Sequence, residues 1–149
     1  GYRLRIGGTK EEGKEVVVQD MTSSGAGYTG LSASNGLSFL CKDMTFTQCG
    51  DIGVFAKNTK GRLINCVITQ CRCSGIWCSE NALIELEGDQ TKVDGNVTRG
   101  NSYTYGLETY DTSSIIHLLF PLTKESVSTN NGGGGNYGGK GTIETVNSF

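Results

Sequence analysis

A short pattern recurs along this chain at nearly constant spacing. Residues 43–57 and 65–79 align without a gap, so that Thr-Gln-Cys falls on Thr-Gln-Cys and one glycine falls on another 22 residues later. A glycine marks the same step in four copies, at Gly30, Gly53, Gly75 and Gly106. Self-similarity at a period in the twenties predicts stacked repeat units. The last spacing is longer than the others, which predicts an inserted loop over residues 90–104.

Apolar and polar positions alternate within each copy. One residue separates Met44 from Phe46, and one separates Ile76 from Cys78. A period of two is typical of strands, and the copies are too short and too rich in Gly, Thr and Ser to predict a helix in each. They also lack the Leu-x-x-Leu-x-Leu frame of a leucine-rich repeat. The sequence therefore predicts coils of short strands, each stacked in parallel on the one before.

The Gly-hydrophobic-x-small steps at the four repeat glycines, with the strands that precede them, resemble the right-handed parallel β-helix (pectate-lyase-like) superfamily. The resemblance covers most of the chain. It implies an all-β right-handed parallel β-helix, a solenoid, and the copies predict about five coils. Such coils share one long, narrow core. Because this fold hosts many activities, the function must be argued from individual residues.

The length of 149 residues predicts a single domain over 1–149. Because the first strand, at residues 2–6, reads as mid-coil, we expect the chain to be a fragment of a longer protein. The most apolar run, 115–120, predicts a buried strand, and the Gly/Asn-rich segment 126–141 predicts a loop. Asparagine and glycine at the polar end of each coil predict corners in which left-handed asparagines stack.

Charge and hydropathy exclude two classes of partner. The 13 Lys and Arg against 15 Asp and Glu give a net charge of −2, unlike the basic surface of a nucleic-acid-binding protein. No apolar stretch is long enough to predict a membrane span. Exposed strand edges at the ends of a solenoid predict possible end-to-end self-association.

The six cysteines fit a core better than a disulfide framework. Cys66 and Cys78 fall on the inward parity, and Cys49 stacks on Cys71 in the repeat alignment. Buried free cysteine behaves as a small hydrophobe, so we expect reduced thiols, which favours a reducing intracellular compartment. The spacings of the cysteines between 66 and 78 match no compact zinc pattern, so we predict neither a metal site nor a cofactor.

The alignment separates inward from outward side chains. The inward columns are Leu31, Val54, Ile76, Leu107 and Ala33, Ala56, Cys78, Thr109; the outward columns are Ser32, Phe55, Trp77, Glu108 and Ser34, Lys57, Ser79, Tyr110. Phe55 and Trp77 become vertical neighbours about 4.8 Å apart. With Lys57 and Tyr110 beside them, they predict a surface that binds a polysaccharide or a protein partner. The alternative is that another segment covers these rings as ordinary packing.

A second resemblance lies at residues 105–111, Tyr-Gly-Leu-Glu-Thr-Tyr-Asp. This run resembles the Tyr-Gly-Phe-Asp-Pro-His-Asp signature of mannuronan C5-epimerases, which implies Tyr105, Glu108 and Asp111 as catalytic residues. Tyr110 stands where that signature has histidine, the side chain that titrates near neutral pH. The alternative function is therefore a carbohydrate-active enzyme, a polysaccharide lyase or C5-epimerase acting on uronate polymers.

Three further features predict little chemistry. The carboxylates of Glu85 and Glu87 alternate onto one face and read as a solvated strand edge rather than a Ca²⁺ site. His117, the only histidine, lies in an apolar run and reads as a packing residue. Asn96-Val-Thr matches a glycosylation acceptor in the inserted loop, which would matter only in a secreted protein.

Overall fold

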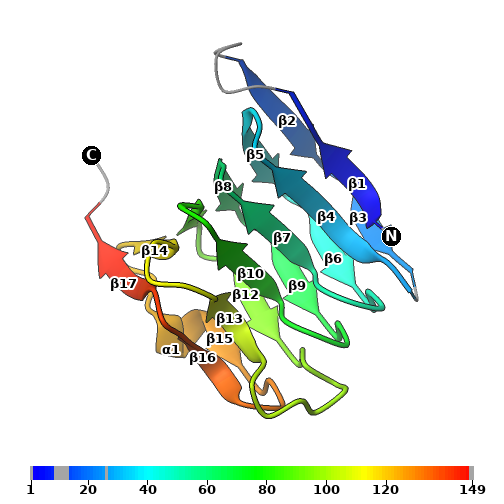
Figure 1. Cartoon of the computed structure of the whole chain (residues 1–149), viewed down its shortest axis with the longest axis vertical. Helices are drawn as coiled ribbons and strands as arrows, with labels where there is room; N and C mark the ends of the chain where they lie inside the picture. The colour runs from blue at the N-terminus through cyan, green and yellow to red at the C-terminus, as the bar shows by residue number, and fades with distance from the viewer. Residues whose placement is uncertain (1, 9–13, 26, 148–149) are drawn as a thin grey trace.

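The computed structural model describes residues 2–8, 14–25 and 27–147. In this part of the chain, three parallel sheets of six, six and five strands run side by side along a solenoid of about six coils (Figure 1). Sheet A contains β1 (Tyr2–Ile6), β4 (Thr29–Ser34), β7 (Val54–Lys57), β10 (Ile76–Ser79), β13 (Tyr105–Thr109) and β16 (Gly135–Gly139). Sheet B contains β2 (Glu15–Gln19), β5 (Ser38–Lys42), β8 (Lys60–Ile64), β11 (Leu83–Glu87), β14 (Ile115–Leu119) and β17 (Thr142–Val146). Sheet C contains β3 (Thr22–Ser24), β6 (Thr45–Thr47), β9 (Val67–Thr69), β12 (Lys92–Asp94) and β15 (Ser128–Thr129).

The prediction of an all-β parallel solenoid is confirmed, with about six coils instead of five. Helix is limited to the single turn α1 (Lys124–Val127) within the described residues. Val16 to Val18 lie in β2, the middle strand of the first coil, because each coil uses three strands. No helix in the described part of the chain is long and apolar enough to cross a membrane.

The inward columns predicted from the repeat form the core. Leu31, Val54, Ile76 and Leu107 pair in register from β4 to β13, and all four side chains have no exposed surface. Sheets B and C add the other large buried side chains, such as Phe39 and Phe46. Each coil therefore buries its apolar face against its neighbours, as a solenoid requires.

The repeat glycines are explained by close approach of the backbone. A Cβ atom built on Gly53 would lie 2.6 Å from the carbonyl oxygen of Gly75 and 2.5 Å from Cγ2 of Ile68 in sheet C. Gly30 meets the carbonyl oxygen of Gly53 in the same way, also at 2.6 Å. Only a residue without a side chain fits this corner, where one coil closes against the next.

Stacked left-handed asparagines occupy the corner between sheets A and B, as predicted. Asn35 and Asn58 both have φ of 50°, and the Asn58 side-chain amide donates a hydrogen bond to Asn35 Oδ1 at 2.9 Å. Glu80 and Asn81 continue the row with φ of 50° and 67°. Asparagine tolerates this conformation better than most residues, which explains its recurrence at each coil end.

The Gly/Asn-rich segment 126–141, expected to be a loop, contains β15 and β16. Strand β16 pairs in parallel with β13 and forms the last rung of sheet A. Gly138 fits beneath a neighbouring ring, since a Cβ on it would lie 2.5 Å from Cε1 of Tyr105, and Gly139 lies against the backbone of Thr109. Glycines that make room for another side chain leave no alternating pattern in the sequence, so composition predicted a loop. The segment 90–104, expected to be an inserted loop, is also partly a strand, because it includes β12.

Candidate functional site

Three aromatic rings form a row on the outer face of sheet A. Phe55 in β7 and Trp77 in β10 are register partners, and their ring centroids lie 4.7 Å apart with an interplanar angle of 9°. Tyr110 follows β13, and its ring centroid lies 5.3 Å from that of Trp77 at an angle of 39°. The three strands lie side by side in Figure 1. Phe55 and Trp77 are vertical neighbours on one face, as the repeat alignment predicts. We call Phe55, Trp77 and Tyr110 the aromatic column.

The stacking decides which ring surface remains open. Phe55 and Trp77 are half-buried, and each covers one face of the other because their planes are nearly parallel. Tyr110 keeps 59% of its surface exposed. Solvent therefore meets mainly the edges of the first two rings and a broad part of the third.

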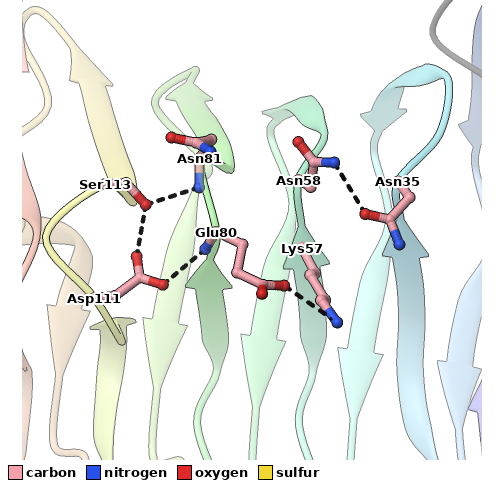
Figure 2. A network of polar contacts seen from close by, with 7 residues as sticks. All are labelled: Asn35, Lys57, Asn58, Glu80, Asn81, Asp111 and Ser113. Atoms are coloured by element: carbon pink, nitrogen blue, oxygen red, sulfur yellow. Dashed lines mark hydrogen bonds and ion pairs between the residues drawn. The ribbon is translucent and has the colours of Figure 1, made fainter.

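Lys57 lies one outward position beyond Phe55 and turns toward the corner between sheets A and B. Its Nζ atom lies 3.1 Å from Oε2 of Glu80 (Figure 2). Both side chains are substantially exposed, so the pair contributes little to stability, at most about 1 kcal/mol. Its main effect is local, because the two opposite charges neutralise each other beside the aromatic column.

A polar depression of about 370 Å³ opens at this corner, next to Tyr110. It is lined by Asn35, Asn58, Glu80, Asn81, Asp111 and Ser113, and we call it the corner groove (Figure 2). The backbone N–H of Glu80 donates to Asp111 Oδ2 at 2.9 Å, and Ser113 Oγ donates to Asp111 Oδ1 at 3.0 Å. These hydrogen bonds, led by the one from Glu80, hold the pKa of Asp111 below its usual value. Sequence reasoning named Asp111 as a possible catalytic residue and treated the other residues of the groove only as turns. The recurrence of Asn, Asp and Ser at successive corners was the available signal.

Glu108 points outward from β13, as the alignment predicts, but it is covered. Only 8% of the residue is exposed, and Oε1 accepts hydrogen bonds from Ser74 Oγ at 2.8 Å and from the Tyr105 backbone N–H at 3.3 Å. Trp77 pairs in register with Glu108, and its side chain lies close to this carboxylate. Burial raises the pKa of Glu108, and the interactions with Ser74, Tyr105 and Trp77 oppose that shift. Glu108 therefore lies against the central ring of the aromatic column.

The coupling between Glu108 and Trp77 predicts a pH-dependent signal. Trp77 is the only tryptophan, so its emission should change as the Glu108 carboxyl ionises, with a midpoint above the usual glutamate pKa. The raised pKa means that the protonated form favours folding. The contribution of protonated Glu108 to stability is complete below the pKa that this carboxyl has in the unfolded chain. It is lost as pH rises through the higher pKa of the folded protein. A fluorescence titration of the wild type and Glu108→Gln measures this. The transition should vanish in the variant, and an identical transition in both proteins would contradict the assignment.

The three residues implied as catalytic occupy different surroundings. The ring of Tyr105 lies over the glycines of β16, against Gly134 and Gly138. Glu108 is held beneath Trp77, whereas Asp111 accepts its hydrogen bonds at the corner. Within the described residues, Glu108 and Asp111 share no hydrogen-bond partner. The two carboxylates therefore belong to separate hydrogen-bond networks.

Ion pairs connect charged side chains on neighbouring strands of sheet B. Glu85 lies 3.6 Å from Lys60 and 3.8 Å from Arg62, and Oε2 of Glu87 lies 4.0 Å from Arg62. His117 lies 3.5 Å from Oε1 of Glu144 in the adjacent strand. The carboxylate row was expected to be a solvated strand edge, but β11 lies inside sheet B, and the Glu85 side chain is only 15% exposed between its basic partners.

Asn96, within the possible glycosylation signal, is buried in the described structure. Its side-chain amide donates to the carbonyl oxygen of Ile68 at 2.9 Å and to Asn131 Oδ1 at 3.1 Å. Its Oδ1 accepts the backbone N–H of Cys71 at 3.0 Å. With 1% of the residue exposed, the amide nitrogen is out of reach of a modifying enzyme in the folded state. Nothing in the local sequence distinguishes this structural asparagine from an exposed acceptor.

All six cysteines are free thiols, and five are fully buried. Burial raises the pKa of Cys41 to about 12 and that of Cys66 to about 11, so neither is a thiolate at neutral pH. The thiols of Cys49 and Cys71 donate to the carbonyl oxygens of Thr47 and Thr69, each at 3.8 Å. Among the residues that the structure describes, no three His, Cys, Asp or Glu side chains are placed to hold a metal ion.

Thiol burial predicts the result of a titration with a disulfide reagent. Only Cys73 is half-buried, so the native protein should expose one reactive thiol and the denatured protein all six. Burial raises the pKa of Cys73 as well, so its reaction should be slow at pH 7 and accelerate with pH. The absorbance of the thiolate released from the reagent gives the number of reactive thiols in the native and in the denatured protein. Rapid reaction of several thiols in the native protein would contradict the buried columns.

Comparison with known proteins identifies no relative. No family model matches the chain, and no match was found among curated proteins or solved structures.

Proposed function

We propose that this chain is a rigid β-solenoid scaffold that binds a polysaccharide on the outer face of sheet A, with the aromatic column as the main contact. The observation that carries the proposal is the row of Phe55, Trp77 and Tyr110 beside the polar corner groove. Aromatic rings next to amide, hydroxyl and carboxylate groups provide both kinds of contact that sugars require. A protein partner, the other ligand that the sequence suggests, is an alternative outcome of the test below.

Rigidity supports a binding role. Phe55 and Trp77 come from adjacent strands, and Tyr110 directly follows β13 with its backbone N–H bonded to the carbonyl oxygen of Cys78, so the sheet sets the spacing of the column. The Trp77 ring stacks on that of Phe55 at 4.7 Å with an interplanar angle of 9°, which restricts its orientation. A surface that is ordered before binding loses little conformational entropy when a ligand arrives.

The three parallel sheets and the repeat glycines also support assignment to the right-handed parallel β-helix superfamily. In that framework the second candidate function is a lyase or C5-epimerase acting on uronate polymers. One observation favours it: the pKa of Glu108 is raised by burial, as a general acid at neutral pH requires. Incubation with polyuronates should then yield unsaturated or epimerised product, and Glu108→Gln should abolish it. No product with the wild type would exclude this activity on those polymers.

The binding proposal is tested by affinity electrophoresis in gels that contain soluble neutral or acidic polysaccharides. The wild type should be retarded in at least one gel, and a Phe55→Ser, Trp77→Ser, Tyr110→Ser triple variant should migrate freely. Val17→Ser is the matched control, because Val17 is an exposed apolar residue on sheet B. It should be retarded like the wild type.

Two outcomes would contradict polysaccharide binding through the aromatic column. One is migration of the wild type that no polysaccharide slows. The other is retardation that the triple variant retains in full. If proteins are captured by the wild type and by Val17→Ser but not by the triple variant, while no polysaccharide binds, the aromatic column serves a protein partner instead.

A further inference from the structure

Tyr110 is the most exposed ring of the aromatic column. Phe55 and Trp77 lie nearly parallel at 4.7 Å, so each covers a face of the other. Tyr110 is tilted by 39° from Trp77 and is 59% exposed. A flat ligand group that needs a ring face therefore meets Tyr110, which borders the corner groove through its neighbour Asp111.

The corner groove presents polar groups at regular intervals. Its lining comes from four successive coils, with Asn35, Asn58, Glu80 with Asn81, and Asp111 with Ser113 at equivalent corners (Figure 2). Successive coils are about 4.8 Å apart, so these groups extend over about 14 Å along the solenoid axis. Each pyranose lengthens an extended glycan by a distance close to the spacing between successive coils. A repeating polar surface of this pitch fits a ligand with repeating polar units.

The hydrogen-bond inventory leaves groups for a ligand. Within the described residues, the Asn81 side-chain amide makes no hydrogen bond, and neither does Nδ2 of Asn35. Each of these amides can donate to a hydroxyl group, and that of Asn81 can also accept from one. Because hydroxyl groups both donate and accept hydrogen bonds, a ligand rich in hydroxyl groups can bond to both amides.

The charges in the corner groove disfavour an acidic ligand. Lys57 and Glu80 neutralise each other at 3.1 Å, which leaves the carboxylate of Asp111 as the uncompensated charge of the lining. The depressed pKa of Asp111 keeps it ionised at neutral pH. A uronate would meet like charge here, whereas an uncharged sugar would find acceptors for its hydroxyl groups.

We infer that the corner groove binds a neutral linear glycan along the solenoid axis, with Tyr110 stacked on one sugar ring and the corner amides hydrogen-bonded to its neighbours. This assignment rests on the proposed function and specifies its site and ligand class. It makes Tyr110 and Asn81 the determinants of affinity, and the edges of Phe55 and Trp77 a secondary contact.

The test is calorimetric titration with neutral cello-, xylo- and mannohexaose and with a galacturonate hexamer, using Trp77 emission as a local reporter. Tyr110→Ala should weaken binding of the preferred neutral hexamer by about tenfold or more, as loss of an anchoring aromatic does. Asn81→Gly removes the amide but keeps the left-handed backbone accessible, and should weaken binding by several-fold. Tyr103→Ala is the control, because Tyr103 is 83% exposed in the inserted loop. It should bind like the wild type.

The possible failures are distinguishable. Binding of a neutral hexamer that neither Tyr110→Ala nor Asn81→Gly weakens would overturn this site and leave the proposed function standing. Tighter binding of the galacturonate hexamer would overturn the ligand class. Absence of binding to every hexamer, together with free migration in all polysaccharide gels, would overturn both. If Tyr110→Ala proves unfolded by circular dichroism, Asn81→Gly decides the question.

Discussion

Replacing Gly53 with alanine is expected to destabilise the protein by about 3 kcal/mol or more, at the upper end of what overpacking costs. The added Cβ would lie 2.6 Å from the carbonyl oxygen of Gly75, and backbone at this corner cannot move without displacing the next coil. Because each coil depends on its neighbours, the strain spreads along the stack. Urea unfolding followed by circular dichroism gives the change in free energy.

The matched control for that substitution is Gly7→Ala. A Cβ on Gly7 meets no atom within 4 Å, so this change should shift the free energy of unfolding by less than about 1 kcal/mol. Equal stability of the Gly53 and Gly7 variants would mean that the coils do not close as tightly as described.

Asn96→Ala is the second substitution with a large expected effect, a loss of about 3 kcal/mol. It leaves the backbone N–H of Cys71 and the carbonyl oxygen of Ile68 without their side-chain partner in a buried site. Each buried group left unsatisfied costs about 1–3 kcal/mol. Thermal unfolding monitored by circular dichroism measures the loss.

Thr98→Ala separates the structural role of Asn96 from its glycosylation signal. Thr98 is exposed, so its loss destroys the Asn-Val-Thr signal while the hydrogen bonds of Asn96 remain. This variant should be as stable as the wild type. Mass spectrometry after expression in a secretory host should find no glycan at Asn96 of the folded wild type. A glycosylated, fully folded protein would contradict the burial of Asn96.

The sequence predicts those parts of the fold in which a single structural requirement explains why one type of residue recurs. The repeat glycines recur because backbone approaches backbone at the same corner, and alternation marks the strands that face the core. Together these patterns place Leu31 and Val54 inside and Phe55 and Trp77 outside, in the register found. An outward position does not specify exposure, however. Glu108 faces outward and is still buried, with its carboxylate hydrogen-bonded to the Ser74 side chain and the Tyr105 backbone.

The parts that sequence reasoning missed depend on contacts between distant segments. Strand β16 is glycine-rich because the ring of Tyr105 lies over Gly138, a relation that composition alone reads as a loop. The corner groove forms only when residues from four coils stack, so its members look like unrelated turns in the sequence. Asn96 reads as an exposed acceptor although its amide connects β9 to the segment after β15. In each case the partner lies at least 23 residues away.

The central claim is that ligands bind on the outer face of sheet A at the aromatic column. The most direct measurement is a nuclear magnetic resonance titration of the labelled 15.8 kDa chain with the polysaccharide or hexamer that it retains. The account predicts that the single indole N–H of Trp77 and the ring signals of Tyr110 shift first, while those of Tyr103 and Tyr137 stay in place. Shifts confined to residues of sheets B or C would contradict it.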